Sequence, residues 1–285
     1  MKLPNRRSLI FLLCVAVAVA LAWGPLSDLV LNGHPSEYYT HIPLIAAISA
    51  YVLFRRRKSL VRGEPGSPIL GIMGIALSLG LFAINAMKRP SLIGHVELVV
   101  PGAILFLAGS FLMLFGRKSF GRALFPFLFL VFMVPLPIAW MEHIVSALTA
   151  GSMGVTYVLF KAFGVPFVQE GPFFRLPGFD LEVARQCSGI RSSLALLITS
   201  VLAGQVFLTG RWRKIALALA VFPAAIFKNG IRIITLYLLS YFVDMRIIQG
   251  GFLHRSGGFV FFGLGLIVLC YFLYLLRKPG DSRVL

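Results

Sequence analysis

Charged residues are scarce in this sequence and make up 13% of its 285 residues, whereas they make up about a quarter of an average soluble domain. Hydrophobic residues account for 58%. This composition excludes a soluble enzyme, and it also excludes an intrinsically disordered chain, which would be poor in apolar residues. Because the apolar residues come in long blocks, the unit of organisation to look for is the membrane span.

Acidic residues are especially few: 10 Asp and Glu stand against 27 Lys and Arg, a formal net charge of +17. In a soluble protein this excess would indicate nucleic-acid binding. Here the basic residues lie between apolar blocks, where membrane topology explains them better. We therefore expect membrane lipids and no nucleic acid as partners.

Cysteine is scarce too, and Cys14, Cys187 and Cys270 are the three in the chain. Their number and scatter exclude a disulfide framework and a zinc site. No spacing of His, Cys, Asp and Glu matches a metal-ligand motif, so we expect neither a metal nor a cofactor. Cys14 and Cys270 lie inside apolar blocks, where cysteine packs as a small apolar residue. Cys187 lies outside them and is a candidate for chemistry.

Nine apolar blocks are present, and a helix needs about 20 residues to cross the hydrocarbon core of a bilayer. The blocks are 8–26, 39–54, 69–87, 95–115, 123–140, 141–163, 188–208, 215–243 and 257–276.

Five basic clusters separate these blocks, and the positive-inside rule places such clusters on the cytoplasmic side. They are Lys2/Arg6/Arg7, Arg55 to Lys58 with Arg62, Arg117/Lys118/Arg122, Arg211/Arg213/Lys214 and Arg277/Lys278/Arg283.

The spans alternate correctly between these clusters only if block 141–163 does not cross. That block contains Glu142, His143 and Lys161 and follows a proline break at 133–137, so we expect an interfacial or re-entrant helix on the outer face. The predicted fold is an all-α polytopic membrane protein with about eight transmembrane helices and both termini cytoplasmic. It forms one integral-membrane domain, 1–285, with an active-site half at about 165–260.

Cys187 is the first of three unusual groups that this topology brings to the outer side. It directly precedes block 188–208 and therefore lies at a helix N-terminus, with Arg185 and Arg191 nearby. A helix N-terminus and neighbouring cations stabilise a thiolate. Gly189 would let another backbone or a substrate approach closely.

Arg232 is the second group and lies well inside block 215–243, at the predicted depth of Cys187. A charge inside a span is costly and indicates a functional site by default. Lys228 and Asn229, one turn below, indicate a polar cavity rather than a side chain that only snorkels to the headgroups.

His254 is the third group and is expected in the last outer loop, at the start of the final span. A thiol, an imidazole and a guanidinium on one side suit acyl transfer. The thiolate attacks, the imidazole moves the proton, and the guanidinium holds the developing oxyanion.

Several segments resemble motifs of the exosortase/archaeosortase family, and the resemblance covers about residues 35–275. The segments are 184–192 around Cys187, the Asn-x-x-Arg motif at 229–233, His254, and accessory motifs at 39–43, 133–137 and 164–171.

The resemblance implies a membrane cysteine peptidase and transpeptidase whose active site faces outward from the cytoplasmic (inner) membrane. It implies that the enzyme recognises a C-terminal sorting signal on secreted proteins, of the PEP-CTERM kind: a Pro-Glu-Pro-type motif, a transmembrane helix and a basic tail. Cys187 would form an acyl-thioester, and the protein would pass to a cell-envelope acceptor. Residues expected to support the site or bind substrate are Arg191, Ser188, Gly189, Asn229, His41 and Glu170.

The roles of Arg232 and His254 stay open. In the archaeal branch, the residue matching Arg232 is proposed as proton donor and the one matching His254 as transition-state stabiliser. Side-chain chemistry favours the reverse, because arginine hardly releases a proton near neutral pH whereas histidine titrates close to it.

Two alternatives use the same observations. A transporter or flippase would explain the span count and the intramembrane Arg232, although the polar groups cluster at the outer face and no inverted repeat is visible. A non-enzymatic membrane subunit of an exopolysaccharide assembly complex would tolerate Cys187→Ala without loss of function.

Overall fold

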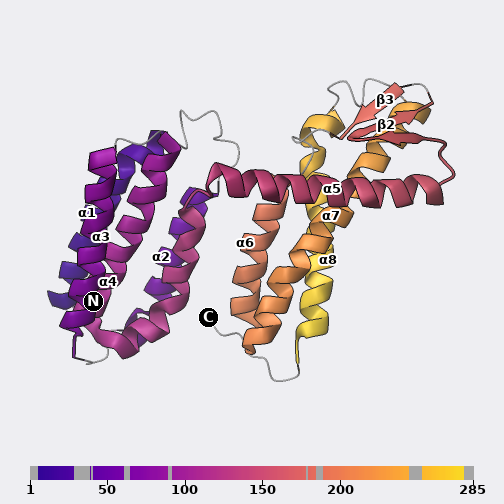
Figure 1. Ribbon diagram of the computed structural model, residues 1–285. Coiled ribbons are helices and arrows are strands. Elements are labelled where there is room, and N and C mark those ends of the chain that lie inside the picture. Colours follow the sequence, from indigo (N-terminus) through magenta and orange to yellow (C-terminus); the bar gives the residue numbers. More distant parts are fainter. Residues whose placement is uncertain are drawn as a thin grey trace. The chain divides into compact units, whose positions relative to one another are not determined.

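The computed structural model describes residues 6–28, 39, 41–60, 65–88, 92–177, 179–183, 189–243 and 252–278. These residues form helices and three short strands in two compact units, Met1–Pro137 and Ile138–Val284 (Figure 1). Six of the described helices are long and apolar enough to cross a membrane. The expectation of a predominantly helical membrane protein is therefore confirmed, while the exact span count, the side of the termini and the single domain 1–285 stay predictions.

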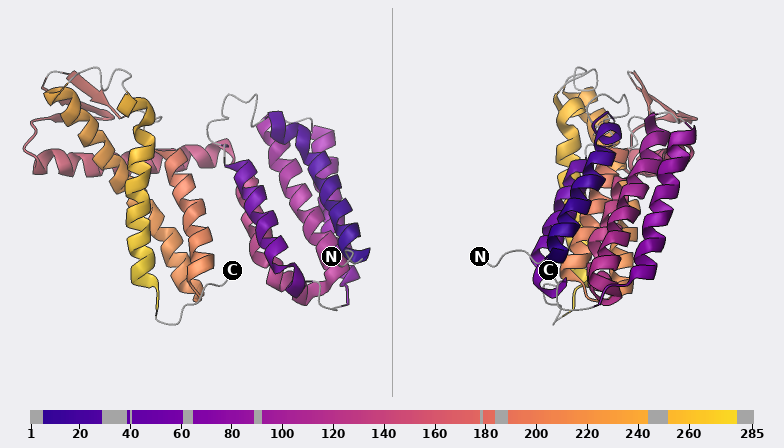
Figure 2. Two further views of the ribbon diagram at one scale, coloured as in Figure 1. Left: turned by 180° about the vertical axis from the view of Figure 1, so that it is seen from behind. Right: turned by 90° about the vertical axis from the view of Figure 1, so that its left-hand side faces the viewer.

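The first unit is a bundle of helices. Its elements are α1 (Arg6–Ser27), α2 (Ile42–Leu60), α3 (Pro68–Lys88), α4 (Leu92–Phe129) and the short 3-10 helix η3 (Leu130–Met133). Both α1 and α3 pack against α4 (Figure 2).

Helix α4 is broken at Gly116, whose φ of 79° and ψ of 171° are not helical. The ribbon turns there and returns beside α2 (Figure 1). The two arms of α4 correspond to the apolar blocks expected on either side of the third basic cluster. Arg56 Nη1, in the second cluster, donates a hydrogen bond to the Arg122 carbonyl at 3.2 Å, so these two clusters lie at the same end of the unit.

The start of α1 lies at this end as well. The Phe11 ring contacts those of Phe111 and Phe115 edge-on, with centroids 5.3 and 5.8 Å apart. Phe11 is one turn beyond Arg7, so the first three basic clusters gather at one end of the unit, as the positive-inside rule requires.

The opposite end of the first unit holds two of the accessory motifs. Tyr39, at the start of the first motif, is buried in a cluster against which Met133, at the start of the second, packs. His41 Nε2 lies 3.1 Å from the carbonyl oxygen of Phe132. The segments 39–43 and 133–137 are therefore packed together, far along the helices from the basic clusters.

The second unit contains α5 (Ile138–Ala162), α6 (Ile190–Phe207), α7 (Arg211–Phe242) and α8 (Phe252–Leu276). Helices α6, α7 and α8 pack side by side, and α5 runs across them (Figures 1 and 2).

Helix α5 is nevertheless long and apolar enough to span a membrane by length and composition, so the expectation that block 141–163 does not cross stays a prediction. At the end of the second unit where α7 begins and α8 ends, Arg213 Nη1 donates a hydrogen bond to the Leu276 carbonyl at 3.1 Å. This contact brings the fourth and fifth basic clusters together.

A small antiparallel sheet follows α5, with strands β1 (Val168–Glu170), β2 (Phe173–Leu176) and β3 (Phe179–Glu182) in the order β1-β2-β3. The predicted all-α fold did not include these strands. Strands of three or four residues are too short for a period of two to be read reliably. Phe174 and Leu176 are buried against α5 and α7, in a cluster with Phe160 and Ile233.

The position of α5 can be tested by labelling single cysteines with an impermeant thiol reagent. In a background without the three native cysteines, we expect Glu142→Cys and Ala162→Cys, exposed residues near the two ends of α5, both to be labelled from outside. Gly121→Cys and Trp212→Cys, exposed beside basic clusters, should be labelled only after permeabilisation. A helix α5 that crosses would expose only one of its two ends, and outside labelling at Gly121→Cys would contradict the topology of the first unit.

Candidate active site

The crossing of α5 over α7 is close because glycines lie on both helices. A Cβ atom at Gly230 or Gly151 would lie 2.5 or 2.7 Å from a side-chain carbon of the facing helix. This approach lets Asn229 Nδ2 on α7 donate a hydrogen bond of 3.0 Å to Ser152 Oγ on α5. Both side chains are buried, and Ser152 Oγ donates in turn to the Leu148 carbonyl at 2.7 Å.

Lys228, the residue before Asn229, carries its charge into the same interior. Its side chain is 3% exposed, and Nζ donates to Ser192 Oγ in the first turn of α6. Ser192 Oγ donates to the Gly189 carbonyl at 2.8 Å, and Ser193 Oγ donates to that oxygen at 2.9 Å. The ammonium is therefore linked to the start of α6. Because the Ser192 hydroxyl proton is directed at a carbonyl, this Lys-Ser pair is not arranged as base and nucleophile.

Gly189 occupies the turn directly before α6. Its φ of 68° and ψ of 20° lie in the left-handed region, which glycine adopts without the steric cost that a side chain brings. A Cβ atom at this position would lie 3.3 Å from Asn229 Oδ1 and 3.5 Å from Ser192 Oγ. The backbone at Gly189 therefore passes directly against the Asn229 side chain.

Arg232 lies one helical turn beyond Lys228, so the two cations share a face of α7. Its side chain is partly buried, and its Nε atom has no hydrogen-bond partner among the described residues. Two cations one turn apart in an apolar helix repel each other, which is tolerated where polar groups or an anion compensate.

The structure brings together some of the predicted site residues. Gly189 and Asn229 are in contact, and Arg191 is exposed in the first turn of α6. Cys187 and Ser188 lie outside the described residues. Ser152 and Ser192 were not singled out, because a serine among apolar residues gives no sign of its partner until the helices that cross are known.

His254 differs from its expected setting. The expected position is the last outer loop, at the start of the final span, whereas α8 begins at Phe252 and includes His254 in its first turn.

Glu170 and His41 have structural partners. Glu170 Oε2 accepts a hydrogen bond of 2.6 Å from Arg175 Nη2 across the β1–β2 hairpin, where both side chains are exposed. His41 belongs to the first unit and contacts the Phe132 carbonyl. Within the described ranges, no three His, Cys, Asp or Glu side chains gather as metal ligands.

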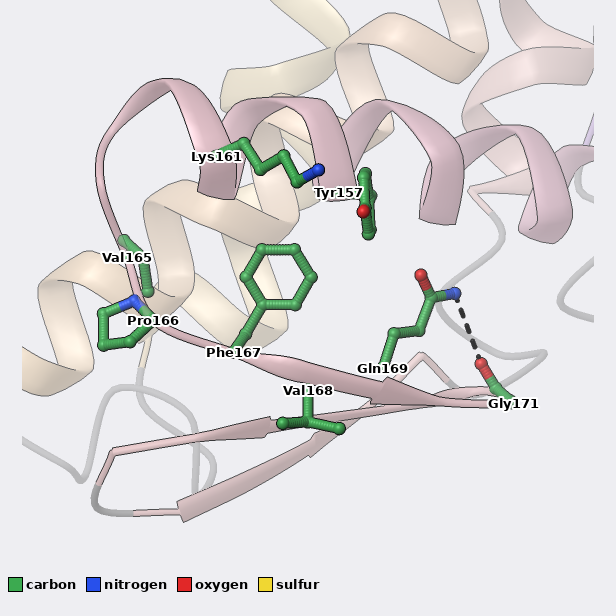
Figure 3. Close-up of a pocket in the computed structure, with 8 residues that line it drawn as sticks. All are labelled: Tyr157, Lys161, Val165, Pro166, Phe167, Val168, Gln169 and Gly171. Carbon is green, nitrogen blue, oxygen red and sulfur yellow. Dashed lines mark hydrogen bonds between the residues drawn. The ribbon is translucent and has the colours of Figure 1, made fainter.

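An open groove of about 780 Å³ lies between α5 and β1 (Figure 3). The accessory motif 164–171 supplies most of its lining, and α5 adds two side chains. The lining residues are Tyr157, Lys161, Val165, Pro166, Phe167, Val168, Gln169 and Gly171.

The apolar helices and the buried cationic network define a multi-pass membrane protein with a candidate active site at the start of α6. The family of transmembrane exosortases matches residues 27–271, and the chain belongs to this family. The resemblance seen in its motifs is thereby confirmed. No curated protein and no solved structure matches the chain significantly.

Replacement of Gly189 tests whether its turn is required. Gly189→Ala should lower the thermal unfolding midpoint of the purified protein, because a left-handed alanine costs about 1–2 kcal/mol and its Cβ would press on Asn229. Gly154→Ala is the matched control, since a Cβ there meets nothing within 4 Å and alanine favours a helix. Equal midpoints for the two variants would show that the Gly189 turn is not constrained.

Proposed function

We propose that this exosortase is a cysteine peptidase and transpeptidase in which Cys187 is the nucleophile and Arg232 and His254 assist. The observation that carries the proposal is the contact between Gly189 and Asn229. It joins the two motifs that matter most for this chemistry, the segment around Cys187 and the Asn-x-x-Arg segment. Gly189 is two residues from Cys187 in the chain, so the buried network of α5 and α7 reaches a residue close in sequence to the proposed nucleophile.

The local charges favour a thiolate at this position. Cys187 precedes the N-terminus of α6, and Arg191 and Lys228 bring positive charge to the first turn of that helix. Helix N-termini and nearby cations both stabilise thiolates. Lys228 contributes through Ser192, which fixes the Gly189 carbonyl.

The reaction then has two steps. The thiolate attacks the scissile carbonyl of the sorting signal, the C–N bond breaks, and the amine leaves with a proton supplied by the enzyme. The acyl group is held as a thioester on Cys187 until an acceptor nucleophile of the cell envelope attacks it and releases the thiolate. His254 suits the proton transfer, and Arg232 suits stabilisation of the tetrahedral oxyanion.

The direction of α6 supports an active site on the outer side of the membrane. This helix runs from Ile190 to Phe207 and ends close to the basic cluster that begins at Arg211. If that cluster is cytoplasmic, Gly189 and the small sheet lie on the outer side of the cytoplasmic membrane. Secreted proteins with a C-terminal motif, transmembrane helix and basic tail would meet the thiol there.

Removal of the thiol is the direct test. Cys187→Ala should abolish processing of a substrate that carries the sorting tail, whereas Cys14→Ala and Cys270→Ala should leave processing intact. A thioester-linked enzyme–substrate band, released by hydroxylamine, should form only when Cys187 is present. Normal processing by Cys187→Ala would remove the covalent mechanism and favour a transporter or a non-enzymatic subunit.

The roles of Arg232 and His254 are separated by the pH dependence of processing. If His254 moves the proton, His254→Gln should remove the limb of the pH-rate profile that lies near neutrality. If Arg232 holds the oxyanion, Arg232→Lys should lower the rate on the order of 10²–10³-fold, the loss seen when one oxyanion donor is removed, without a change in the profile.

An unchanged pH profile in His254→Gln would return proton transfer to Arg232. The amount of each variant in the membrane must be measured beside its activity, because Arg232 is partly buried in α7 and its loss can reduce folding.

A further inference from the structure

The hydrogen-bond pattern of the small sheet shows which edge groups of β1 are open. Val183 N donates to the Pro172 carbonyl at 2.9 Å, so Pro172 faces the third strand. Because backbone groups alternate along a strand, Phe173 faces β1 and forms a bonded pair with Glu170. Gln169 therefore directs its N–H and C=O away from β2. Among the described residues, no strand pairs with β1 on that side.

The groove between α5 and β1 lies next to this edge (Figure 3). The Gln169 side chain points into it, toward Tyr157 on α5. Lys161 is the one charged residue among those that line the groove, and its Nζ lies 4.7 Å from the centre of the Tyr157 ring. The groove thus combines an open strand edge, apolar walls and a single positive charge.

We propose that the open edge of β1 binds the substrate's recognition segment as an added strand that places an acidic side chain beside Lys161. An extended peptide added to a sheet edge gains affinity from backbone hydrogen bonds and specificity from pockets for alternate side chains. The peptide residue that pairs with Gln169 directs its side chain to the same face of the sheet. That face is the groove, where the matching charge is negative.

This inference rests on the proposed function, and it explains the shape of the signal given there. In an added strand, the backbone groups of successive residues point in opposite directions. Only the peptide residue opposite Gln169 must therefore offer its N–H to β1. The residues on either side face away from β1, so proline is tolerated at both. A Pro-Glu-Pro segment fits this arrangement. Its central Glu offers an N–H to Gln169 and a carboxylate to Lys161, and its two prolines occupy the positions at which no N–H is needed.

Proline variants on the two edges of the sheet test the strand pairing. Gln169→Pro removes the outward N–H and leaves the β1–β2 ladder, whereas Glu182→Pro is the matched change on β3, where Glu182 also faces away from β2. Both are made in full-length Cys187→Ala protein, so that binding is measured without turnover. The probe is a fluorescent peptide with a central Pro-Glu-Pro.

We expect Gln169→Pro to weaken peptide binding about tenfold, because one backbone hydrogen bond to the peptide is lost. Glu182→Pro should change the affinity less than twofold. Equal affinities of Gln169→Pro and the parent, with equal unfolding midpoints, would overturn the proposal, as would equal weakening by both prolines.

A charge exchange at Lys161 covers the case in which a proline variant does not fold. Lys161 is exposed, so Lys161→Glu should fold, lose affinity for the Pro-Glu-Pro peptide and gain affinity for a Pro-Lys-Pro peptide. Unchanged preference would refute the role of Lys161.

The two proposals fail in different ways. Cys187-dependent processing that is insensitive to Gln169→Pro would leave the transpeptidase and reject the β1 site. Peptide binding that depends on β1, in a protein that never processes substrate, would keep the β1 site and reject the transpeptidase.

Discussion

The hydrogen bond from Asn229 to Ser152 lies where α5 crosses α7, and the two helices come close there because glycines face the neighbouring helix. In an apolar interior, an amide or an ammonium without a partner costs several kcal/mol, so Asn229 and Lys228 constrain what is packed around them. Asn229 holds α5 across α7, and Lys228 holds the first turn of α6 through Ser192. Helix α5, which the first contact joins to α7, also carries Tyr157 and Lys161 of the groove and Phe160, against which the small sheet packs.

The fold could be predicted from the sequence to the extent that charge and apolar length determine it. The basic clusters lie together at one end of each unit, through Arg56 with Arg122 and Arg213 with Leu276, as their positions along the chain indicated. The turn in α4 at Gly116 also follows the predicted boundary. The sheet was missed because its strands are stabilised by burial of Phe174 on Phe160, a tertiary contact that no local pattern records.

The candidate site could be predicted in part. Its charged residues are easily recognised in an apolar helix, whereas the serines that bind them are not. Lys228, Asn229 and Arg232 stand out inside a span, and Gly189 stands out beside a cysteine. Ser152 and Ser192 do not, since serine is common in membrane helices and its partner depends on the crossing of α5 and α7. His254 was expected in a loop, whereas α8 begins at Phe252 and already includes it.

Among the described residues, the clusters around Tyr39, Phe111 and Ala18 are built from residues of the first unit. During synthesis, the helices of residues 1–137 can therefore complete their packing in the membrane while the rest of the chain is still in the ribosome. Asn229 emerges long after Ser152, so the contact that organises the candidate site forms late. Biosynthesis thus separates insertion of the first unit from assembly of the candidate site, and a chain interrupted before α7 would be anchored in the membrane without the contact between Asn229 and Ser152.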